Sequence, residues 1–102
     1  MAQKSDNSDK NNKFCVLIIE EKSDLRTFFM GVLTKSGNYE VKNAATPIEA
    51  LDIISKEAAQ IHVVLFDWDM KEMSGDIFAQ KIKNEVNYDH IELVVCSASI
   101  DC

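Results

Sequence analysis

Apolar residues follow two alternating patterns along this chain: short continuous runs, and longer segments in which they recur every three or four positions. Continuous runs are typical of buried strands, whereas the spaced pattern is typical of amphipathic helices. The runs predict four strands, at residues 14–19, 39–45, within the run 61–70, and at 91–96. The spaced segments predict three helices, which begin near Ser23, Thr46 and Ser74.

The first predicted helix has a start signal, an apolar stripe and a stop signal. Ser23 can cap the start of the helix, and Gly37 can end it. The apolar positions between these two residues recur at helical spacing and are expected to face the core: Leu25, Phe28, Phe29, Val32 and Leu33.

The second and third predicted helices carry clearer start signals. Thr46-Pro47-Ile48-Glu49 combines a capping box with proline at the first helical position, and this helix is expected to end near Glu57. Ser74-Gly75 opens the third helix. The residues expected to be buried are Ile48, Leu51, Ile54 and Ala58 in the second helix and Ile77, Phe78 and Ile82 in the third.

Strands that alternate with amphipathic helices predict right-handed crossovers between parallel strands. The sheet should then be parallel and covered by helices on both faces, which is a doubly wound α/β fold. Residues 1–13 are polar, with too little apolar surface to fold, and are expected to be a disordered leader. Residues 14–102 are expected to form one domain.

Composition narrows the class of protein. The chain has 102 residues, of which 46% are hydrophobic and 27% charged, as in a small soluble domain. It has neither the apolar core of a signal peptide nor a run long enough to span a membrane, so the cytoplasm is the expected compartment. A net charge of −6 argues against direct binding to nucleic acid. Cys15 and Cys96 fall in predicted buried strands and Cys102 ends the chain, which favours three free thiols.

Carboxylates follow two of the predicted strands at the point where each strand ends. Asp67 follows an apolar run, and Glu20-Glu21 follow the first strand. Because the carboxyl ends of parallel strands meet at one edge of a sheet, where such folds bind ligands, these side chains should lie close together. The sequence therefore predicts an acidic site at this edge.

Three segments together resemble the receiver domain of two-component response regulators. They are the strand that ends in Glu20-Glu21, the segment Leu65-Phe66-Asp67-Trp68-Asp69-Met70-Lys71-Glu72-Met73-Ser74-Gly75, and Val94-Val95-Cys96-Ser97-Ala98. The family has an acidic pair after its first strand, a phosphoaccepting Asp after its third, and Ser or Thr before Ala after its fourth. The resemblance implies a three-layer, flavodoxin-like fold and a signalling domain rather than an enzyme.

The resemblance also implies a role for each residue of the site. Asp67 would accept a phosphoryl group from a histidine kinase or a phosphorelay protein. Glu20, Glu21, Asp67 and the backbone carbonyl of Asp69 would hold Mg²⁺, a hard cation that prefers oxygen ligands. Ser97 would contact a phosphoryl oxygen.

The chain departs from the family pattern at three places. Glu21 stands where Asp is usual, and Lys71 stands where Pro is common. The family has a fifth strand that bears a Lys, followed and preceded by further helices, whereas this chain stops at Cys102. We therefore expect weakened Mg²⁺ binding and an unpaired fourth strand in a sheet of order 2-1-3-4. Either the chain is a fragment of a longer regulator, or two copies associate through that strand.

Two alternatives remain open from the sequence. One is a degenerate receiver that binds partners without being phosphorylated. The other is a haloacid-dehalogenase-like phosphohydrolase, because Asp67-Trp68-Asp69 is similar to the DxD motif of those enzymes. Asp67 would be the nucleophile, Asp69 the acid/base and Ser97 the distal hydroxyl. The strand that ends in Glu20-Glu21 has no role in that second alternative.

Overall fold

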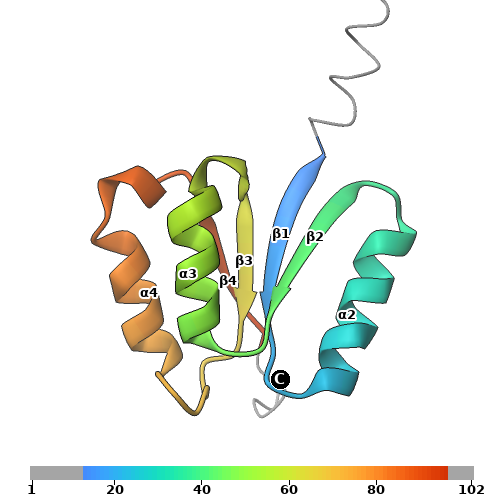
Figure 1. The fold of residues 1–102 in the computed structure, drawn as a ribbon, viewed down its shortest axis with the longest axis horizontal. Coiled ribbons are helices and arrows are strands. Elements are labelled where there is room, and N and C mark those ends of the chain that lie inside the picture. The colour runs from blue at the N-terminus through green and yellow to red at the C-terminus, as the bar shows by residue number, and fades with distance from the viewer. Residues whose placement is uncertain (1–12, 97–102) are drawn as a thin grey trace, which may run out of the picture.

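The computed structural model describes residues 13–96, which form one parallel sheet of four strands with helices on both faces (Figure 1). The strand order β2-β1-β3-β4 confirms the predicted doubly wound α/β fold. The strands are β1 (Phe14–Ile19), β2 (Tyr39–Ala44), β3 (Val63–Phe66) and β4 (Glu92–Val95). The helices are α2 (Ser23–Lys35), α3 (Pro47–Glu57) and α4 (Gly75–Lys83), with 3₁₀ turns η1 (Ala58–Gln60) and η2 (Val86–Tyr88).

The core lies between the sheet and the pair α3 and α4, and α2 covers the opposite face (Figure 1). Alternate residues of a strand point to opposite faces, so Leu17 of β1 and Phe66 of β3 enter this core. Ile18, between two core residues, instead lies near Phe29 of α2. At the centre of the core the rings of Phe66 and Phe78 lie 5.2 Å apart.

Local hydrogen bonds fix the start of α3 much as the capping box predicts, except that Glu49 accepts from the N–H of Ala45 and not from that of the cap residue Thr46. The Thr46 hydroxyl accepts from the Glu49 N–H at 3.1 Å, and the Glu49 carboxylate accepts from the Ala45 N–H at 2.9 Å. Pro47 is the first helical residue, where its missing N–H is harmless. At α4, the Ser74 hydroxyl accepts from the Ile77 N–H at 3.2 Å. Both predicted starts are confirmed.

The start of α2 differs from the prediction. Ser23 is the first residue of the helix, and Lys22 takes the cap position without a side-chain hydrogen bond. The turn before the helix is instead held by the Glu20 carboxylate, which accepts from the Lys22 N–H at 3.2 Å. The predicted stop is confirmed, because Gly37 has a φ of 79°, a conformation that favours glycine, and its N–H donates to the Thr34 carbonyl at 3.0 Å.

Several apolar helix residues that were predicted to be buried are exposed. In α3 the buried face is Pro47, Ala50 and Ile54, and Ile48, turned about 100° around the axis from Pro47, is 56% exposed. In α4 the same offset leaves Ile77 49% exposed beside the buried Phe78.

The apolar stripe predicted for α2 is only partly buried, because Leu25, Phe29 and Leu33 are half-buried and the rest of it is exposed. None of its residues is fully buried, and Phe28 and Val32 are more than half exposed. The reason is that no other described helix lies on this face of the sheet, so only the side of α2 that meets β1 and β2 is covered (Figure 1).

The two described cysteines are free thiols in different surroundings. Cys15 is buried in β1, and burial raises the pKa of its thiol. Cys96, predicted to be buried, is exposed because it follows β4, which has a neighbouring strand on one side only among the described strands. Cys102 lies outside the described residues.

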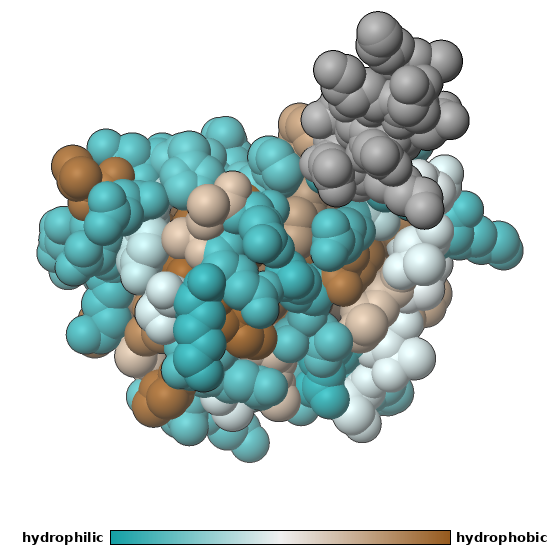
Figure 2. Space-filling model, turned by 45° about the horizontal axis from the view of Figure 1, so that its top comes forward, coloured by the Kyte–Doolittle hydropathy of each residue, from teal (hydrophilic) through white to brown (hydrophobic). Residues whose placement is uncertain are grey.

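Two further predictions concern the ends of the chain and its surface. Residues 1–12 of the predicted leader lie outside the described residues. Within residues 13–96, no helix is long and apolar enough to cross a membrane. Seen more from the end where the strands begin, the surface is mostly hydrophilic and carries separate hydrophobic patches (Figure 2).

Replacing Phe78 with alanine should lower the free energy of unfolding by about 3–5 kcal/mol, because it removes the ring that packs against Phe66 and leaves a cavity in the core. Ile77→Ala is the matched control on the same helix, and it should cost less than about 1 kcal/mol because Ile77 is half exposed. Urea unfolding followed by circular dichroism measures both. Equal losses would contradict this assignment of the buried face.

Candidate functional site

Asp67 follows β3 directly, at the edge where the parallel strands end (Figure 1). Its side chain is partly buried, and one carboxylate oxygen accepts from the Asp69 N–H at 3.0 Å. This local bond shapes the turn that leads out of the strand.

The register of the sheet brings the acidic pair to the same edge. Ile18 of β1 pairs with Leu65 of β3, and Glu20 and Asp67 each stand two residues further along the chain, just past the ends of these strands. Glu20 is fixed by its backbone, since its N–H donates to the Ala44 carbonyl at 3.1 Å and its carbonyl accepts from Arg26 Nη1 at 2.7 Å.

Glu21 reaches from the end of β1 to the loop that follows Asp67. One of its carboxylate oxygens accepts from the backbone N–H of Lys71 at 2.8 Å, between residues fifty positions apart. This hydrogen bond joins the two acidic strand ends directly.

Gly75 allows α4 to begin against the same loop. Its N–H donates to the Trp68 carbonyl at 2.8 Å. A Cβ atom at Gly75 would lie 2.7 Å from the Trp68 Cα, which is closer than real contacts allow, and 3.1 Å from the Asp67 carbonyl oxygen, which is a tight contact. The loop that carries Asp67 therefore needs glycine at this position.

The end of β4 lies beside the strand that carries Asp67. The Cys96 N–H donates to the carbonyl of Phe66, the residue before Asp67, at 2.8 Å. Ser97, the predicted phosphoryl contact, lies outside the described residues, as does Ala98.

The donor chemistry of the site fits Mg²⁺, because Glu20, Glu21 and Asp67 offer carboxylate oxygens at one edge. Each of these three carboxylates accepts a hydrogen bond from a backbone N–H, those of Lys22, Lys71 and Asp69 respectively. Within residues 13–96, no three His, Cys, Asp or Glu side chains are grouped closely enough to hold a metal ion. The predicted ligands thus lie at one edge of the sheet, but their side chains are not gathered around a common point.

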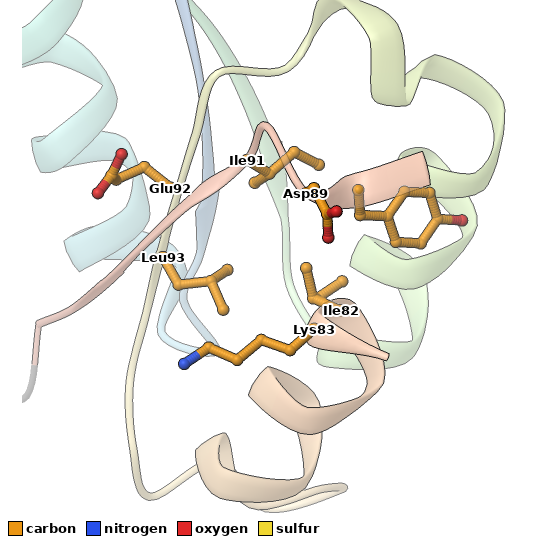
Figure 3. Close-up of a pocket in the computed structure, with 7 residues that line it drawn as sticks. Ile82, Lys83, Asp89, Ile91, Glu92 and Leu93 are labelled. Carbon is orange, nitrogen blue, oxygen red and sulfur yellow. The ribbon is translucent and has the colours of Figure 1, made fainter. Parts of the chain in front are cut away.

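A cavity of about 330 Å³ lies away from the acidic edge, between α4, η2 and the start of β4 (Figure 3). Ile82 of α4 and Leu93 of β4 both point into it. Asp67 is instead near the other end of β4, since Phe66 pairs with Val95. The cavity is therefore separate from the acidic site.

Sequence reasoning missed two features of the site. One is the hydrogen bond from the Lys71 N–H to Glu21, and the other is the contact of Gly75 with the loop that carries Asp67. Both join segments that meet only in the folded chain. One signal was present: Glu at position 21 and a residue with an N–H at position 71 both depart from the family pattern.

The order of the strands defines a flavodoxin-like α/β domain, and the acidic edge is a candidate site at the carboxyl ends of its strands. The chain belongs to the family of response regulator receiver domains, whose family model matches residues 16–102. Receiver domains are signalling domains of two-component systems.

Individual relatives agree with this assignment. A chemotaxis protein CheY homolog of Campylobacter jejuni is 28% identical over 80 residues, which cover 78% of this chain and 61% of that protein. The sensor histidine kinase TmoS of Ectopseudomonas mendocina is 33% identical over 86 residues, 84% of this chain and 8% of that protein. The structure of the chemotaxis response regulator CheY4 of Vibrio cholerae superposes with a TM-score of 0.71 at 25% identity, covering 80% of this chain and 68% of that one. The chain thus spans less than two thirds of the length of the CheY homolog.

Gly75→Ala should lower the free energy of unfolding by about 1–3 kcal/mol, because the added Cβ overlaps the Trp68 backbone. Gly31→Ala, inside α2 with no atom within 4 Å of the added Cβ, should raise it by about 0.5–1 kcal/mol. Chemical unfolding of the two variants gives both values. A stabilising Gly75→Ala would show that the loop after Asp67 does not pack as described.

Proposed function

We propose that this chain is a phosphoacceptor receiver domain, in which Asp67 accepts a phosphoryl group from a histidine kinase or a phosphorelay protein. The observation that carries the proposal is the register of β1 and β3, which brings the strand ends that precede Glu20 and Asp67 to the same carboxyl edge of the sheet. The similarity to a sensor histidine kinase supports a place in histidine kinase signalling, and we propose the cytoplasm as its compartment.

The transfer needs an accessible carboxylate, and Asp67 is partly exposed. An oxygen of Asp67 forms a bond to phosphorus while the bond from phosphorus to the imidazole nitrogen of the donor breaks, and that nitrogen then takes up a proton. The Cys96 N–H donates to the carbonyl of Phe66, the residue before Asp67. Because Ser97 follows Cys96 in the chain, this hydrogen bond supports the proposal that Ser97 contacts a phosphoryl oxygen.

Mg²⁺ is the proposed cofactor, with Glu20, Glu21, Asp67 and the backbone carbonyl of Asp69 as its ligands. When bound, it would neutralise negative charge between the acceptor carboxylate and the phosphoryl group. The added charge on Asp67 would then shift the populations of the surrounding loops, which is how such a domain signals.

Incubation with Mg²⁺ and a small acyl phosphate should add one phosphoryl group to the wild-type chain and none to Asp67→Asn, which lacks the nucleophilic oxygen. Asp76→Asn, on the exposed side of α4, is the matched control and should be modified like the wild type. Intact-mass spectrometry counts the adducts, and circular dichroism verifies that each variant is folded.

A degenerate receiver that binds partners without phosphorylation is the second candidate function. The observation that favours it is that the Glu21 carboxylate is bonded to the Lys71 N–H in a site with no three grouped metal-ligating side chains among the described residues. An unmodified but folded wild-type chain in the experiment above would favour this candidate. The family match leaves the phosphohydrolase alternative without support.

We also propose that two copies associate through β4. Among the described strands, β4 pairs on one side with β3 and lies at the sheet edge on the other. Val94 and Val95 are 39% and 43% exposed there. An edge strand with exposed apolar side chains is a template for pairing with another chain.

Val94→Lys should weaken self-association at least about tenfold, because charge on an edge strand opposes pairing. Val86→Lys, which adds the same charge at an exposed valine in η2, should leave it unchanged. Sedimentation velocity across a range of concentrations measures the association. A wild-type chain that stays monomeric at every concentration would contradict the role of β4.

A further inference from the structure

We propose that Glu21 and the backbone N–H of Lys71 form a clasp that closes the acidic edge, and that Mg²⁺ must compete with this clasp for the Glu21 carboxylate. The clasp is defined as the hydrogen bond from Lys71 N to Glu21 Oε2, 2.8 Å long. The proposal rests on the proposed function, because it concerns the same metal site.

The clasp ties together two segments that otherwise meet only through the sheet. Glu21 follows β1, and Lys71 lies in the loop between β3 and α4, four residues after Asp67. A hydrogen bond to an ionised carboxylate is about twice as strong as one between neutral groups, so it holds this loop against the end of β1.

The clasp requires both departures from the family pattern. Proline at position 71 has no N–H to donate, whereas Lys71 has one. Aspartate at position 21 would be one carbon–carbon bond shorter, about 1.5 Å. Withdrawing the acceptor by that distance from a 2.8 Å contact would exceed the hydrogen-bond range. The two departures from the family pattern, Glu21 and Lys71, are therefore linked, because the hydrogen bond between them needs both.

The consequence concerns metal binding. The Glu21 oxygen that accepts from Lys71 is one of the oxygens that the site would offer to Mg²⁺, which needs near-ideal octahedral geometry. Mg²⁺ binding and opening of the clasp are then coupled, so that a change that weakens the clasp should strengthen Mg²⁺ binding. The loop from Asp69 to Ser74 would be held while Glu21 accepts from the Lys71 N–H, and it would be released if the Glu21 carboxylate turned to the cation.

The first part of the test needs no metal. Amide hydrogen exchange by NMR should show the Lys71 N–H exchanging at least about tenfold more slowly in the wild type than in Glu21→Ala. The His62 N–H, which donates to the Cys15 carbonyl at 2.9 Å at the far end of the strands, is the internal control and should not change. Equal exchange of the Lys71 N–H in both proteins would overturn the clasp.

The second part measures Mg²⁺ alone, titrated against the fluorescence of Trp68, which lies between Asp67 and Asp69 and is the sole tryptophan of the chain. Lys71→Pro removes the donor and should bind Mg²⁺ about three- to tenfold more tightly than the wild type. Lys71→Ala keeps the N–H and should match the wild type.

The outcomes separate this inference from the proposed function. Equal or weaker Mg²⁺ binding by Lys71→Pro, with clear binding by the wild type, would overturn the competition and leave the proposed metal site standing. No Mg²⁺ binding by any of the three proteins would overturn the competition and the proposed cofactor together, while the amide exchange would still report on the clasp itself.

Discussion

The parallel register between β1 and β3 is the constraint on which the site depends. Val16 pairs with Val63 and Ile18 with Leu65, so each strand delivers its first polar residue to the same level of the sheet. A shift of one residue would also turn every side chain of the strand to the opposite face, exchanging core residues for those under α2. The packing of the core therefore fixes the position of the carboxylates.

Local patterns were sufficient to predict the elements and their order, but not which helix residues face the core. Thr46 and Ser74 cap their helices through bonds that span three residues, so their effect is visible in the sequence. Ile48 and Ile77 are as apolar as the residues beside them, and whether they are buried depends on the angle at which each helix meets the sheet. Periodicity alone does not contain that angle.

The site divides in the same way. The carboxylates were predicted because each follows a strand, and parallel strands end together. The bond from Lys71 to Glu21 and the contact of Gly75 with Trp68 were not predicted, since both join segments whose approach is set by the packing of α4. The function of the site depends on those contacts between segments, because they decide which carboxylate oxygens a cation can reach.

The solvent-exposed outer side of α2 has a consequence for local unfolding of the protein. A helix without a fully buried side chain has little to lose by detaching, so α2 should be the first part of the fold to unfold locally. Its Arg26 holds the Glu20 carbonyl, and detachment would release that anchor while the core between the sheet and α3 remains intact. The rigidity of the acidic edge would then be governed by the least stable helix of the domain, and would soften with temperature before the protein melts.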